Sequence, residues 1–85
     1  MSGTGADAVP AAPRTLADLA VGEHGRVATL DGPSVVVERL LEMGLTRGAE
    51  VSVVRFAPLG DPMEVKVRGY LLSLRKADAR AIYVR

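Results

Sequence analysis

The clearest pattern in the chain is a strict alternation of apolar and charged residues between positions 63 and 68. Apolar side chains stand at 63, 65 and 67, and charged ones at 64, 66 and 68. This period of two predicts a strand with one face on a core and the other in water. Gly69 then permits a turn, and Tyr70, Leu72 and Leu74 alternate with more outward positions along a return strand. The pattern therefore predicts a β-hairpin.

Three other runs have β-rich composition. They are His24–Leu30, Val51–Phe56 and Ile82–Val84. Glycine and proline end the first run, the second is apolar on both faces, and the loop Ala57–Pro62 follows it. We expect the last run to pair back to an early strand, which would remove a free edge from the sheet.

One helix is predicted after Pro33. Ser34 can cap its start, and Val37, Leu40 and Leu41 fall at the spacing of one apolar stripe. Two shorter helical turns are expected, one behind the capping-box pattern Thr15–Asp18 and one over Lys76–Arg80. About five short strands with one inserted α-helix and short helical turns indicate a mainly β fold, closed into a small barrel.

Glycine marks the end of the predicted helix. With Gly44 in the left-handed position, Leu45 is expected to pack on Leu40, the apolar contact of a Schellman stop. A tight connection through Gly48 then leads into the next strand. These glycines, with Gly69, are interpreted as structural because no phosphate-loop pattern surrounds them.

Composition narrows the function. The first thirteen of the 85 residues are mostly small, so we expect 1–13 to be a flexible tail and 14–85 to form one domain. A core this small leaves little room for a deep active site, which argues against an enzyme. With 11 basic and 10 acidic residues the chain lacks the charge excess of nucleic-acid-binding proteins, and the absence of cysteine excludes disulfides and thiolate metal sites. Neither a signal peptide nor a membrane span is indicated, which favours the cytoplasm.

Several segments resemble one protein family. They are TLADL near residue 15, RLLEMGLTRG at 39–48, PLGDP at 58–62, VRGYLLSLRKADA at 67–79 and AIYV at 81–84. Together they make the chain similar to the FeoA family over residues 15 to 85. The resemblance implies an SH3-like barrel and a cytosolic accessory role in bacterial ferrous iron uptake. The implied partner is the cytoplasmic GTPase portion of a FeoB-type transporter.

Metal and catalytic candidates are weak. His24 is the only histidine, and a single imidazole is far short of the ligand set of a metal site. Asp61 and Glu64 form the only close acidic pair beside a loop, but Glu64 falls on the polar face of its strand. We therefore expect no metal site, no catalytic group and no cofactor.

The candidate partner-binding residues are the proline-bounded loop and two arginines. They are Pro58, Leu59, Gly60, Asp61, Pro62, Arg47 and Arg75. A rigid loop loses little entropy on binding, and arginines are common at interface hot spots. Two questions stay open. The first is whether Leu59 contacts a partner or covers a barrel end. The second is whether the arginines at 39, 47, 68 and 75 serve an interface, or instead stay solvated or form ion pairs with Glu38, Glu42 and Glu50.

A second function is also compatible with a small barrel of this kind. Similar barrels are appended to iron- and manganese-dependent repressors, so an SH3-like module of a transcriptional repressor, or one that binds nucleic acid, is the alternative. The sequence shows no helix-turn-helix segment, and such a module would have to act detached.

Overall fold

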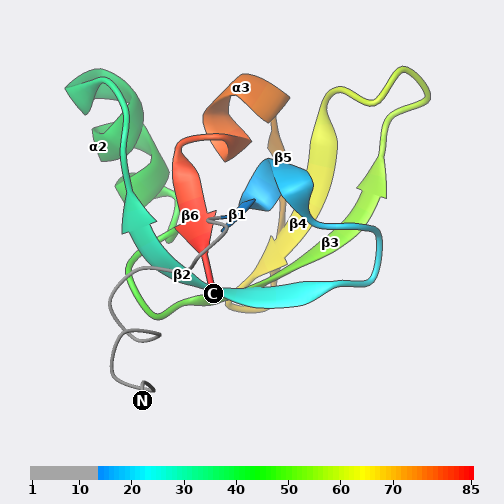
Figure 1. The fold of residues 1–85 in the computed structure, drawn as a ribbon, viewed down its shortest axis with the longest axis horizontal. Coiled ribbons are helices and arrows are strands. Elements are labelled where there is room, and N and C mark those ends of the chain that lie inside the picture. The colour runs from blue at the N-terminus through cyan, green and yellow to red at the C-terminus, as the bar shows by residue number, and fades with distance from the viewer. Residues whose placement is uncertain (1–13) are drawn as a thin grey trace, which may run out of the picture.

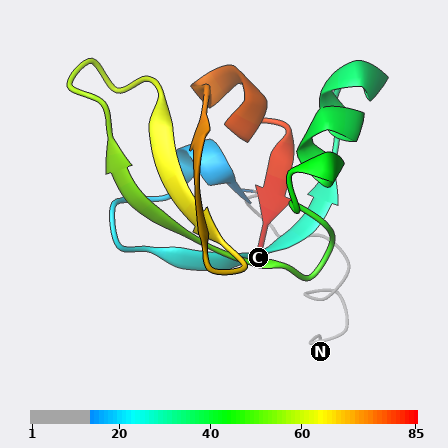
Figure 2. The same cartoon turned by 180° about the vertical axis from the view of Figure 1, so that it is seen from behind.

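Six antiparallel strands form one curved sheet with the order β1-β6-β2-β3-β4-β5 (Figures 1 and 2). The computed structural model describes residues 14–85, and the expected tail of residues 1–13 lies outside the described part. The strands are β1 Arg14–Thr15, β2 His24–Leu30, β3 Glu50–Phe56, β4 Met63–Val67, β5 Tyr70–Leu74 and β6 Ile82–Val84. The sequence predicted about five of them. The additional strand is the two-residue β1, which is too short to carry a periodic pattern.

Three helical segments connect the strands: the 3₁₀ turn η1 Leu16–Asp18, the helix α2 Ser34–Glu42 and the short helix α3 Lys76–Ala79. Helix α2 follows β2, and α3 leads into β6. Figure 1 shows both helices at the end of the sheet where the loop between β3 and β4 lies. The predicted mainly β fold with one inserted helix is confirmed.

The β4–β5 hairpin closes through a two-residue turn. Val67 pairs with Tyr70, and Arg68 and Gly69 between them have φ values of 52° and 86°. Positive φ at both central residues is the geometry of a type I′ turn, which matches the twist of the flanking strands. The alternation places Val65 and Val67 in the core, with exposed fractions of 0% and 2%.

Helix α2 ends in the predicted Schellman motif. The N–H of Leu45 donates to the carbonyl of Leu40 at 3.1 Å, and the N–H of Gly44 to that of Leu41 at 3.0 Å. Gly44 has φ +98°, and Leu40 and Leu45 are both fully buried. The stop therefore fixes the direction in which the chain leaves the helix.

The start and the inner face of α2 differ from the prediction. Ser34 is the first helical residue, and Pro33 occupies the N-cap position with no side-chain cap bond. Leu41 is 43% exposed, whereas Val36 packs against the core. With apolar residues on nearly every side of this helix, its contacts with the sheet decide which of them are buried. Tyr70 also differs: it lies beside the hairpin turn and is 72% exposed.

The core is entirely apolar. Among residues 14–85, no polar or charged side chain is buried. Packing of aliphatic side chains between the curved sheet and the helical segments is thus the main source of stability. The core comprises Leu16, Leu19, Val27, Leu40, Leu45, Ala49, Val51, Val53, Met63, Val65, Val67, Leu74, Ala79, Ala81, Ile82 and Val84.

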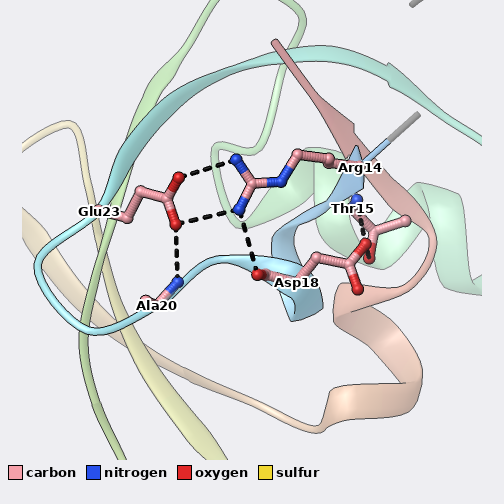
Figure 3. A network of polar contacts seen from close by, with 5 residues as sticks. All are labelled: Arg14, Thr15, Asp18, Ala20 and Glu23. Carbon is pink, nitrogen blue, oxygen red and sulfur yellow. Dashed lines mark hydrogen bonds and ion pairs between the residues drawn. The ribbon is translucent and has the colours of Figure 1, made fainter. Parts of the chain in front are cut away.

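A polar network fastens the first described residues to the rest (Figure 3). Arg14 donates to both oxygens of Glu23 at 2.8 and 3.0 Å, and Glu23 also accepts the N–H of Ala20 at 2.9 Å. Asp18 accepts the N–H of Thr15 at 2.8 Å, which is the reach-back bond of the predicted capping box. The bonds from Arg14 and Ala20 lower the pKa of Glu23 to about 2. Glu23 is thus a charged clamp across the turn before β2.

Candidate functional site

The loop between β3 and β4 is closed by its own backbone. The N–H of Ala57 donates to the carbonyl of Pro62 at 2.9 Å, and that of Gly60 to Ala57 at 2.7 Å. Gly60 has φ +90°, which turns the chain back toward β4. Leu59 at the tip is 95% exposed, so it does not cover the barrel end. Of the two alternatives for Leu59, the structure therefore excludes cover of the barrel end: Leu59 extends into solvent.

Side-chain contacts hold this loop against the start of α3. The carboxylate of Asp61 accepts the N–H of Lys76 at 3.1 Å. The ammonium of Lys76 lies 5.2 Å from the centroid of the Phe56 ring, which is a cation–π distance. It also lies 3.8 Å from the point where a Cβ would stand if residue 60 carried a side chain. The loop is thus anchored on both of its sides and presents an apolar tip.

The structure brings Arg75 to this loop. Asp61, Pro62, Ser73 and Arg75 line one open hollow of about 400 Å³. Among the described residues Arg75 has no ion pair, although Asp61 lines the same hollow. Six of the seven predicted site residues, 58–62 and Arg75, therefore belong to one end of the molecule, which we call the loop surface.

Arg47 lies elsewhere. It follows α2 in the connection to β3, which Figure 1 shows at the opposite end of the sheet from the loop. It lines a second open hollow of about 590 Å³, together with Arg26, Lys66 and Arg68. No residue lines both this hollow and the one at Arg75. A single small contact would not cover both surfaces.

The second hollow is strongly basic, and sequence reasoning did not find it. It is lined by His24, Arg26, Arg47, Gly48, Ala49, Glu50, Val51, Ser52, Lys66, Arg68 and Gly69. The cross-strand registers explain it, because His24 pairs with Ser52 and Ser52 with Lys66. Four arginines and lysines then gather around the single acidic residue Glu50. Their separation in sequence, 26 to 68, hides this cluster until the strand order is known.

The arginines use other partners than the glutamates considered from the sequence. Arg39 pairs with Asp78 at 3.0 Å, and Arg55 pairs with Glu64 at 2.8 Å. Arg68 donates to the carbonyl of Gly44 at 3.3 Å and to the hydroxyl of Thr46 at 2.6 Å. Glu38, Glu42 and Glu50 form no ion pair within residues 14–85. Arg68 thus ties the hairpin to the helix stop while its charge stays unneutralised.

Residues 14–85 bring no three His, Cys, Asp or Glu side chains together as a metal site would require. His24 lines the basic hollow, where neighbouring cations would oppose a bound metal ion. None of the described helices has the length and apolar character needed to cross a membrane.

Comparisons with known proteins agree on one family. The FeoA domain model matches residues 14–85. A curated relative from Porphyromonas gingivalis, the Fe(2+) transport protein A/Fe(2+) transporter FeoB fusion protein, is 38% identical over 69 residues. That match covers 81% of this chain and 8% of the relative, so the chain corresponds to a small part of the fusion protein.

Solved structures share the fold. The FeoA protein of Chlorobium tepidum is 42% identical with a TM-score of 0.79, over 85% of this chain and 69% of that one. The Stenotrophomonas maltophilia FeoA, described as a prokaryotic SH3 domain protein and solved with zinc, is 28% identical with a TM-score of 0.76, over 85% and 89%.

A manganese-dependent transcriptional repressor has a TM-score of 0.82 over 92% of this chain and 38% of its own, at 20% identity, which shows the fold alone. The family model, by contrast, matches all 72 of the described residues in sequence, from 14 to 85. The observed mainly β architecture is also that of the FeoA structures. The chain therefore belongs to the FeoA family, whose domain is linked to ferrous iron transport.

Proposed function

We propose that this protein is a cytosolic accessory protein of bacterial ferrous iron uptake that binds the cytoplasmic GTPase portion of a FeoB-type transporter. The relative in which a similar segment is fused to FeoB supports this partner. Fusion makes the contact between two domains intramolecular and so raises their effective concentration. A separate chain would need a binding surface of its own to reach the same partner.

The loop surface supplies such a contact, and Leu59 is the observation that carries the proposal. A leucine that is 95% exposed has nearly its whole side chain available for burial by a partner. The loop behind it is already fixed by the Ala57–Pro62 and Asp61–Lys76 hydrogen bonds, so little order has to be gained on binding. Arg75 beside it offers a guanidinium to a carboxylate or phosphate.

Arg47 enters the proposal differently. Because it lies in the basic hollow, it would contact the transporter only if a second part of the partner reached around the sheet. We therefore assign the main contact to Leu59 and Arg75, with Arg47 as an outlying residue. In this proposal the domain provides a surface and contributes no catalytic group to GTP hydrolysis.

A binding titration with the purified cytoplasmic GTPase portion tests the proposal. Leu59→Asp should weaken binding by about 10- to 100-fold, because burial of a leucine side chain contributes about 1.5–3 kcal/mol. Val35→Asp is the matched control, since Val35 is 67% exposed in the first turn of α2 and does not line the hollow at Arg75. Equal affinities for wild type, Leu59→Asp and Val35→Asp would reject the loop surface, and absence of wild-type binding with GTP, GDP or no nucleotide would reject the partner.

A further inference from the structure

Strand β5 is an edge of the sheet that the fold leaves unpaired. Its ladder is formed with β4 alone, and the order of strands ends with it. No other backbone hydrogen bond between described residues involves the five positions of β5. Figure 2 shows β5 nearly edge-on at the front of the molecule, with no segment drawn before it. Its outer backbone groups face solvent.

The register identifies which groups these are. Val67 and Tyr70 close a two-residue turn, so they form a hydrogen-bonded pair, and hydrogen bonding alternates along an antiparallel ladder. Tyr70, Leu72 and Leu74 thus bond to β4. The N–H and carbonyl groups of Leu71 and Ser73 are directed to the outer edge.

This edge lacks the features that usually protect one. The strand contains no lysine, proline or other charged residue, and the β4–β5 register has no bulge. Tyr70 and Leu71 on it are 72% and 63% exposed. Apolar side chains beside free backbone donors and acceptors are what an added strand requires for recognition.

Positive charge surrounds the edge. Arg68 precedes β5 and Arg75 follows it, while Lys66 lies directly across from Leu71 on β4. Within residues 14–85 none of these three cations forms an ion pair. The nearby carboxylate of Glu64 is already paired with Arg55 at 2.8 Å. The flanks of β5 therefore carry uncompensated positive charge.

We propose that the free edge of β5 accepts an extended acidic segment of a partner protein as an additional strand. The edge needs backbone hydrogen bonds, which a lipid surface cannot supply, and the flanking cations favour acidic side chains. A second copy fits less well: antiparallel pairing over all five residues would bring Arg68 of one copy opposite Lys76 of the other. This goes beyond the proposed function: Arg75 borders both the edge and the loop surface, and Ser73→Pro and Leu59→Asp probe the two separately.

Amide hydrogen exchange with two synthetic peptides tests the proposal. The first alternates glutamate and valine over six residues, and the second replaces each glutamate by lysine. The acidic peptide should slow exchange at Leu71 and Ser73, with Tyr70 and Leu72 little changed because they already bond to β4. We expect it to bind about tenfold more tightly than the basic peptide at low salt, since three exposed cations each add a modest attraction.

Three variants locate the contact. Ser73→Pro removes an outward donor while the ladder to β4 stays intact, so binding should be lost; Ser73→Ala is its matched control and should bind like wild type. Lys66→Glu should remove most of the preference for the acidic peptide. Should Ser73→Pro fail to fold, the exchange result at Leu71 and Ser73 on the wild-type chain still decides, because Lys66 also lines the basic hollow.

Three outcomes would overturn the proposal. Equal binding of both peptides would show that charge does not select the occupant. Protection at Arg47 without protection of Leu71 and Ser73 would place the acidic peptide in the basic hollow instead. Protection of Leu71 and Ser73 that rises with protein concentration and without peptide would assign the edge to a second copy of this chain.

Discussion

Replacement of Gly44 by alanine should destabilise the domain through the backbone alone. Gly44 has φ +98°, and a Cβ built there would lie 3.7 Å from Cδ of Arg68, an ordinary van der Waals distance. The cost is therefore conformational and amounts to about 1–2 kcal/mol, the penalty of a left-handed backbone for an L-residue. A domain of this size loses roughly 4–8 °C in Tm for each kcal/mol.

Urea and thermal unfolding followed by circular dichroism measure this effect. Asparagine tolerates the left-handed region better than alanine, so Gly44→Asn should lie between the wild type and Gly44→Ala in the free energy of unfolding. The slope of unfolding with urea should stay the same in all three, because the surface exposed on unfolding is unchanged. If alanine proved as stable as glycine, or more stable than asparagine, the helix stop would not depend on the conformation of residue 44.

Three further outcomes are expected. Leu40→Ala, at a fully buried position, should lower the free energy of unfolding measured by chemical denaturation by about 2–5 kcal/mol, whereas Leu41→Ala, at a 43% exposed position, should lower it much less. Equal losses in the two variants would contradict the observed inner face of α2. Glu23→Gln should lower the free energy of unfolding most above pH 4.5. Because the pKa of Glu23 is lowered to about 2, the difference in this free energy between the variant and wild type should shrink as the pH falls toward that value in acid titrations of unfolding. A pH-independent difference would refute the clamp. Arg75→Ala should leave GTP turnover by the transporter's cytoplasmic portion unchanged at saturation in a phosphate-release assay, and a loss of rate would make Arg75 a catalytic residue.

Local patterns in the sequence were sufficient for most of the fold. The alternation at 63–67 and the glycine at 44 each depend on contacts within a few residues, and both features are present as predicted. The inner face of α2 was mispredicted in part, because Val36, Val37 and Leu41 are similar in hydrophobicity and only docking on the sheet distinguishes them. Burial of Val36 over Leu41 is a tertiary effect.

The site residues were harder to predict for the same physical reason. Arg39 and Asp78 are 39 positions apart, so their ion pair could not be anticipated from neighbouring charges. The basic hollow likewise requires the registers of β2, β3 and β4. The sequence did identify the loop at 58–62, since prolines and glycine act locally, but the exposure of Leu59 had to come from the structure.

The footprint of the transporter on this domain tests the central claim most directly. In an NMR titration of the ¹⁵N-labelled protein with the cytoplasmic GTPase portion of a FeoB-type transporter, we expect the largest shifts at the amides of Leu59, Gly60, Asp61 and Arg75. The amides of Arg26 and Arg47, in the basic hollow, should move little. Shifts confined to that hollow, or a spectrum unchanged at saturating partner, would contradict the account.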